Sequence, residues 1–260
     1  MNLTDNEVLK FQKGSPVFIE DICAVFPATL GEIVDEGYDN FQKYLSIVLI
    51  EKPANTEHKG DKELTELLAK LTDFQYLLML ALTDKVVNQT IKDAFRFFTH
   101  ESINFSIDPA QIIVGPPEEK HILDEEKFYD FQRLIRRMYF IEQEGEEIII
   151  SDSDSSATRR IKEQMRANRE KVRKAKAKKA AQEKSDLKFS DLIGSLTINN
   201  CNLNMANIWN ITYYAFHDQL KRMGWRDQFD INNRAALAGA KLKKSQLKHW
   251  MRSIANSDKD

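Results

Sequence analysis

The chain contains little cysteine, glycine or proline: its 260 residues include 2 Cys, 9 Gly and 6 Pro. So low a Gly and Pro content excludes collagen-like and other fibrous chains. Cys23 and Cys201 lie far apart, and neither has a second cysteine or a close histidine in a metal-binding or redox pattern. A reduced intracellular protein is therefore the simplest expectation.

Long hydrophobic runs are also absent. The longest apolar stretch, Tyr76 to Leu82, has 7 residues, whereas about 18 to 20 are needed to cross a bilayer. Residues 1–13 carry acidic and polar side chains where a signal peptide would carry basic and then apolar ones. We therefore expect neither membrane insertion nor export.

No catalytic or metal motif stands out. The 5 histidines never form HExxH or another close ligand pair. The chain also lacks GxGxxG, GxxxxGK[ST] and GxSxG. Its carboxylates cluster in polar runs, which is typical of solvated surfaces. The sequence thus predicts a non-enzymatic protein without metal or cofactor.

What the chain does have is charge, unevenly distributed. Residues 1–157 contain 15 Lys/Arg and 30 Asp/Glu, residues 158–184 contain 12 and 3, and residues 185–260 contain 11 and 7. The total of −2 therefore divides into −15, +9 and +4 along the chain. This asymmetry predicts three parts: an acidic domain over 1–150, a Ser/Asp-rich and then Lys/Arg-rich linker over 151–186, and a small domain over 187–260. Apolar spacing predicts that the first domain is mainly helical, that the linker is helical or disordered, and that the last domain is all helical.

Hydrophobic periodicity predicts a mainly α fold with a small β element in the first domain. Apolar residues at helical spacing indicate helices over 29–37, 39–50 and 125–141, and two or three more over 63–99. Ile103, Phe105 and Ile107 alternate with polar residues, which predicts a short strand that pairs with Gln111–Val114. The pattern over Val17–Ile22 does not decide between helix and strand.

Two segments between the predicted domains each allow two interpretations. Ile148–Ile150 beside acidic serines is either an edge strand before a solvated linker or a strand that pairs with a partner's sheet. Residues 158–184 have too few large apolar residues to pack on a core, so a charged spacer is favoured. Nucleic-acid binding is the alternative, because a +9 segment would neutralise phosphates, although no aromatic residues are interleaved with the basic ones.

In the second domain the spacing predicts a helix from Met205 to Met223 with Gly224 at its end. A turn is expected over Trp225–Asp230, followed by one or two last helices from about Ala235.

Six residues are candidate partner contacts, each with a structural alternative. Tyr213, Tyr214 and His217 form either an exposed aromatic face or part of the core. Arg234 precedes a run of small residues, Ala235–Ala240, where another backbone could approach closely or two helices pack tightly. The remaining two, in the first domain, either line a groove for an apolar helix or belong to the core: Phe95 and Phe98.

The C-terminal residues 209–254 resemble the tail assembly chaperones of phages that infect Gram-positive bacteria. Three phrases carry the resemblance: TYYAFHD at Thr212–Asp218, RAALAGA at Arg234–Ala240, and HWM at His249–Met251. PATLGEI at Pro27–Ile33 and AFRFFTHESINFS at Ala94–Ser106 are compatible with it. The polar KLKKSQLK connection before His249 departs from the shorter acidic turn expected there.

The resemblance implies a protein without catalysis. Such chaperones coat the tape measure protein and keep it soluble, and their second domain recruits tail tube subunits. The chain would then be the long, two-domain product, made by ribosomal frameshifting near Lys178 and Lys179. It would associate with itself along the tape measure protein in the host cytoplasm and be absent from, or displaced in, the mature virion.

Overall fold

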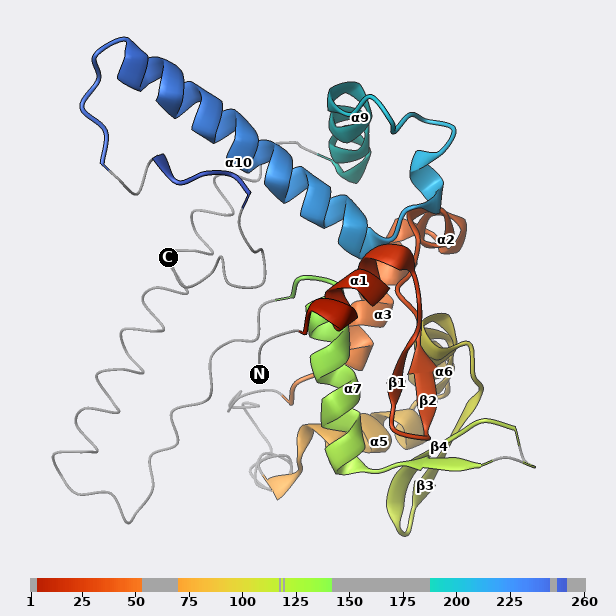
Figure 1. Ribbon diagram of the computed structural model, residues 1–260. Coiled ribbons are helices and arrows are strands. Elements are labelled where there is room, and N and C mark those ends of the chain that lie inside the picture. Colours follow the sequence, from red (N-terminus) through yellow and green to blue (C-terminus); the bar gives the residue numbers. More distant parts are fainter. Residues whose placement is uncertain are drawn as a thin grey trace, which may run out of the picture. The chain divides into compact units, whose positions relative to one another are not determined.

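The computed structural model describes residues 4–52, 70–116, 118, 120–141, 188–243 and 247–251. The described part is mainly helical with a small β component, as predicted (Figure 1). Its elements follow in chain order: α1 (Asp5–Lys13), β1 (Val17–Ile19), β2 (Cys23–Val25), α2 (Leu30–Glu36), α3 (Tyr38–Val48), α5 (Asp73–Thr83), α6 (Lys85–Thr99), β3 (Ile103–Ile107), β4 (Ala110–Val114), β5 (His121–Leu123), α7 (Glu125–Met138), α9 (Phe189–Asn199), the 3₁₀ helix η1 (Ile208–Asn210) and α10 (Tyr213–Leu237).

The chain divides into two compact units, one of Met1–Ile141 with Leu203–Asp260 and one of Glu142–Asn202. Residues 187–260, predicted as one domain, are thus shared between the two units. The predicted boundaries at 150/151 and 186/187 lie outside the described residues, as do Ile148–Ile150 and the basic segment 158–184. The three-part domain division therefore stays a prediction.

Two small antiparallel sheets lie in the first unit. β3, β4 and β5 pair in that order, with Ile103 opposite Val114 and Ile112 opposite Leu123. These four side chains are buried, since residues on alternate positions of neighbouring strands share one face. The predicted pairing of β3 with β4 is confirmed. The segment Val17–Ile22, for which the sequence did not decide between helix and strand, forms strand β1 and the loop of a hairpin with β2.

Several helices of residues 4–141 begin at a side-chain N-cap. Thr29 caps α2 in a capping box with Glu32, whose carboxylate accepts the Thr29 N–H at 2.7 Å. Asp84 caps α6 by accepting the N–H groups of Val86 and Val87. The predicted helices over 29–37, 39–50 and 125–141 are confirmed within a few residues as α2, α3 and α7.

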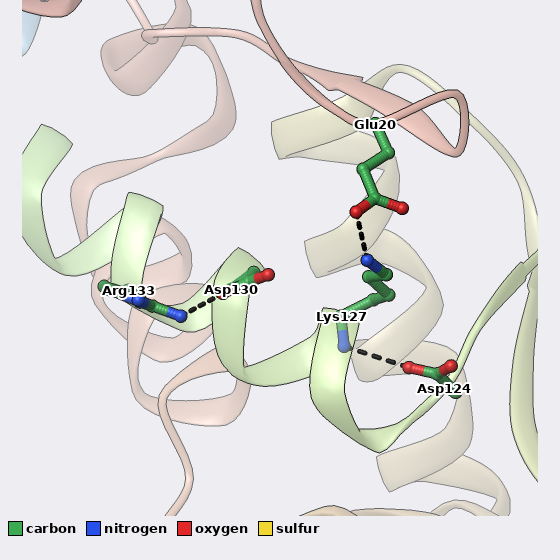
Figure 2. Close-up of polar contacts among 5 residues, drawn as sticks. All are labelled: Glu20, Asp124, Lys127, Asp130 and Arg133. Carbon is green, nitrogen blue, oxygen red and sulfur yellow. Dashed lines mark hydrogen bonds and ion pairs between the residues drawn. The ribbon is translucent and has the colours of Figure 1, made fainter.

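The outer face of α7 is polar and contacts the β1–β2 hairpin. Figure 2 shows Lys127 paired with Glu20 of the hairpin loop, while its own N–H donates to the cap residue Asp124 at 3.0 Å. Arg133 pairs with Asp130 one helical turn away. Exposed pairs of this kind add little to stability. The Lys127–Glu20 pair connects α7 to the hairpin loop, whereas the Arg133–Asp130 pair lies within α7.

The prediction for residues 205–230 is wrong in two respects. Ile208–Asn210 forms a 3₁₀ turn, and α10 begins only at Tyr213. It then continues through Gly224, which is exposed and has no atom within 4 Å of the place where a Cβ would stand. An exposed interior glycine costs a helix about 1 kcal/mol relative to alanine without ending it.

The end of α10 lies instead at Gly239, which has φ +91°. The Ala240 N–H donates to the Ala235 carbonyl across it, as in helix ends that use a left-handed glycine. Residues 238–243 and 247–251 contain no α-helix, so a last helix after α10 is not seen in the described part of the chain. None of the helices with known placement is long and apolar enough to cross a membrane.

Candidate functional site: an aromatic junction

Within the first unit, the start of α10 binds the N-terminal part of the chain near α1 and α2 (Figure 1). We call Ile208–Asp218 the docking segment, and the rings that receive it the aromatic surface: Phe11, Phe41, Tyr139 and Phe140. The Leu30 N–H donates to the Ile211 carbonyl at 2.9 Å, and the Tyr213 N–H donates to the Ala28 carbonyl at 2.8 Å. Thr29 and Thr212 thereby form a one-residue antiparallel bridge.

Thr212 makes both of its hydroxyl bonds at this junction. Its Oγ1 donates to the Phe11 carbonyl at 2.8 Å and accepts the Ala215 N–H at 3.0 Å, which caps α10. The side chain is only 2% exposed. Because a buried hydroxyl without partners is costly, these two bonds make the contact specific.

A glycine allows the close approach of the two segments. A Cβ placed on Gly31 would stand 3.1 Å from the carbonyl oxygen of Trp209. This distance is tighter than nine in ten contacts of real Cβ atoms, so a side chain at position 31 would push the Trp209 carbonyl away by a few tenths of an ångström. Glycine at position 31 therefore lets the two segments pack at this distance without displacing the Trp209 carbonyl.

Tyr213 is buried rather than exposed to a partner. Its ring centroid lies 5.5 Å from that of Phe41 and 5.4 Å from that of Tyr139, and the residue is 8% exposed. The Tyr139 hydroxyl in turn accepts the Ala28 N–H at 3.1 Å. Burial raises the pKa of Tyr213 above its ordinary value.

Tyr214 is likewise buried, at 2% exposure. Its ring stacks on Phe140 at 4.6 Å and tilts against Phe11 at 5.3 Å, and burial raises its pKa to about 12. The predicted exposed aromatic face of Tyr213 and Tyr214 is therefore wrong, and their alternative placement in the core is confirmed. The rings that cover them belong to residues 11–140, far away in the sequence.

His217 completes this cluster from the next turn of α10. Its ring lies 4.3 Å from that of Tyr213, 5.8 Å from that of Phe140 and 5.3 Å from that of Phe216. The Nε2 atom is buried and has no hydrogen-bond partner among the described residues. Burial lowers the pKa of His217 to about 4, so the imidazole is neutral at pH 7.

Asp218 closes the junction with polar contacts. Its Oδ2 accepts from Gln12 Nε2 at 3.4 Å and from Arg222 Nε at 3.0 Å. The carboxylate is nearly buried and both contacts neutralise part of the cost of its burial. Gln12 thus ties α1 to the docking segment.

The other predicted contact residues lie elsewhere. Phe95 and Phe98 are 1% and 0% exposed, and they pack on Phe131 at 4.9 Å and on Tyr139 at 5.5 Å. Of the two alternatives for these residues, burial in the core is confirmed and a groove lined by them is not. Arg234 is exposed on the last turns of α10, and at Gly239 no atom of the described chain lies within 4 Å of the place where a Cβ would stand. The close backbone approach expected after Arg234 is therefore not found there.

A recess of about 300 Å³ lies between α2, the end of α6 and the segment after β2. The Phe26 and His100 rings stack at 4.2 Å in it, and no Lys or Arg is among its lining residues: Phe26, Ala28, Glu32, Asp35, Glu36, Phe97 and His100. Carboxylates and the C-terminal end of a helix favour a positively charged side chain and disfavour a phosphate, and the aromatic faces accept a cation or an apolar group.

A metal-binding cluster or a reactive thiol would indicate chemistry beyond the junction. No group of three His, Cys, Asp or Glu side chains in the described ranges is arranged to hold a metal ion. Burial, with a smaller effect of Glu101, raises the pKa of Cys23 to about 12, so this thiol stays protonated. The junction joins apolar rings to satisfied hydrogen bonds, as protein–protein contacts do.

Sequence reasoning missed the residues that receive the docking segment. Phe11, Tyr139 and Phe140 carry no motif, and a bridge of one residue pair leaves no periodic pattern. The readable signals were the N-cap threonines, Thr29 and Thr212, each directly before a helical pattern. Such a signal places a helix start but not its partner.

Residues 177–255 match the family model of the YomV second domain. This match fits a phage protein, covers less than a third of the chain, and includes the whole docking segment. No curated protein and no solved structure matches the chain.

Proposed function

We propose that this protein is a non-enzymatic tail assembly chaperone of a phage. In the host cytoplasm it binds the tape measure protein, keeps it soluble and recruits tail tube subunits. The observation that carries the proposal is an overlap: the match at 177–255 contains all three phrases by which the C-terminal residues resemble tail assembly chaperones. The first of these phrases, Thr212–Asp218, lies within the docking segment.

The described surface supports this proposal physically. A chaperone for a long helical protein needs repeated weak sites, because avidity along the ligand replaces affinity at each site. The recess offers one such site for an apolar or basic side chain. The −15 charge of residues 1–157 keeps the chaperone from binding acidic surfaces and favours basic partners.

Co-expression with the tape measure protein encoded in the same genome tests the proposal. Expressed alone, the tape measure protein should be insoluble, and in the presence of the chaperone it should elute with it as a complex. A tape measure protein from an unrelated phage is the control for specificity. If the tape measure protein from the same genome stays insoluble both alone and in the presence of this protein, the chaperone function is contradicted.

Nucleic-acid binding through residues 158–184 is the competing function, and this segment lies outside the described residues. Fluorescence anisotropy with a labelled DNA or RNA duplex at low salt separates the two functions. The chaperone proposal predicts no salt-sensitive binding that depends on residues 158–184. Binding that disappears both with added salt and with deletion of this segment would favour the alternative.

A further inference from the structure

The contact between the docking segment and the aromatic surface has the properties of a recognition site between separate chains. Two of its hydrogen bonds join main-chain groups of Ala28 and Leu30 to those of Ile211 and Tyr213. A third joins the Thr212 hydroxyl to the main-chain carbonyl of Phe11. Any copy of the chain presents the same groups in the same order, so the docking segment of a second copy offers the aromatic surface the same contacts.

The connection between the two halves of the junction is long. The chain leaves the first half at Ile141 and returns at Leu203, and the residues between belong to the other compact unit. The intervening residues, 142–202, would reach about 200 Å if fully extended. Covalent connection therefore does not require the docking segment to bind its own chain, in contrast to two halves joined by a short turn.

We propose that the docking segment of one copy binds the aromatic surface of a second copy, so that the protein associates with itself by exchange of Ile208–Asp218. The contacts are identical within and between chains, so the balance depends on the protein concentration relative to the effective concentration that the linker sets. Short flexible linkers give effective concentrations on the order of millimolar and longer linkers give lower ones, so protein that is more dilute than this is closed on itself. Exchange becomes dominant when copies are held together at comparable local concentrations. This inference does not depend on the chaperone proposal.

Gln12 and Asp218 provide the test, because their side chains face each other across the junction at 3.4 Å. The background is the full-length chain with Cys201→Ser, since Cys201 is exposed and Cys23 is buried with its pKa raised to about 12. One variant carries Gln12→Cys, a second carries Asp218→Cys, and a third carries both. A short bismaleimide then links two thiols only where the junction has formed.

The double variant reports the closed form, which gives an internally linked monomer at low concentration. A mixture of the two single variants links two chains only if the docking segment has been exchanged. The linked heterodimer should rise at least roughly tenfold between 10 μM and 1 mM, a range that reaches the effective concentrations on the order of millimolar of short linkers and so exceeds that of a longer one. A mixture of Asp218→Cys with Lys43→Cys, an exposed position on α3, is the control for random encounters.

Internal linking of the double variant without linked heterodimer at 1 mM, or a heterodimer no more abundant than in the Lys43→Cys control, would overturn the exchange. Absence of internal linking in the double variant would overturn it as well, since the junction itself would then be missing. Gly31→Leu, which blocks the close approach to Trp209, gives an independent check: added to the Gln12→Cys chain it should abolish the heterodimer. The same substitution in the Asp218→Cys chain should leave the heterodimer intact.

Discussion

At the scale of single residues, Thr212 connects the start of a helix to a distant part of the chain. Its hydroxyl accepts the Ala215 N–H and donates to the Phe11 carbonyl, so one side chain serves as N-cap and as a tertiary contact. Thr4 makes a capping box at the exposed start of α1, within four residues of sequence. The two threonines therefore allow the tertiary part of the effect to be separated from capping.

We predict that Thr212→Val lowers the free energy of unfolding by about 2 to 3 kcal/mol, from the lost cap and the unpaired buried carbonyl. Thr212→Ser should keep most of the wild-type free energy of unfolding, because the hydroxyl is retained. Urea unfolding followed by circular dichroism measures both. The matched change Thr4→Val should cost only about 1 kcal/mol, and equal losses at the two positions would show that the bond to Phe11 contributes nothing.

His217 predicts how stability depends on pH. Its pKa is about 4 in the folded protein and about 6.5 when unfolded, so the unfolded chain binds the extra proton between these values. The stability that the neutral imidazole provides is fully present above pH 6.5. It is lost progressively as the pH falls towards 4, by up to about 3 kcal/mol.

Urea unfolding at several pH values between 7 and 4 tests this dependence in the wild type and in His217→Phe. The phenylalanine fills the same aromatic cluster and has no proton to gain, so the variant should lose less stability on acidification by up to about 3 kcal/mol. Parallel pH profiles of the two proteins would mean that His217 is not the group responsible.

At the scale of elements, α10 shows how far helical patterns can be extrapolated. Periodicity correctly predicted a helix in this region, yet both of its ends were misplaced. The N-terminal end is set by Thr212, which pairs with Phe11 and Thr29. The C-terminal end is set by the left-handed conformation at Gly239, and Gly224 is an ordinary helical residue.

The two glycines should respond in opposite ways to alanine. Gly224→Ala should stabilise α10 by about 0.5 to 1 kcal/mol, because a helical position with free space around it gains from the better helix former. Gly239→Ala should destabilise it by about 1 to 2 kcal/mol, since φ +91° is strained for an L-residue. Helical content during urea unfolding measures both changes, and stabilisation by both substitutions would contradict the assigned end of α10.

At the scale of the whole molecule, the docking segment completes the core of residues 4–141. Phe11, Phe41, Tyr139 and Phe140 contact Tyr213, Tyr214 or His217 directly. Removing the docking segment would expose these rings to water, at a cost that scales with the apolar area uncovered. Large exposed apolar patches are unusual on monomeric proteins and favour association.

We therefore predict that a chain ending at Ile141 binds the dye ANS more strongly and unfolds at lower temperature than the full chain. A chain ending at Ala238 keeps the docking segment and serves as the control, so its dye binding should stay close to that of the full chain. Dye fluorescence and thermal unfolding by circular dichroism measure the difference. Equal values for both truncated chains would show that the aromatic surface does not depend on the docking segment.

The sequence by itself determined the mainly helical class, the strand pair β3 and β4, and the starts of α2 and α7. Helical spacing, alternation and caps are local, so they can be read within about ten residues. Only the tertiary structure decided that Tyr213 and Tyr214 are covered. Their partners come from residues more than 70 positions away, and burial depends on which surfaces meet rather than on local pattern.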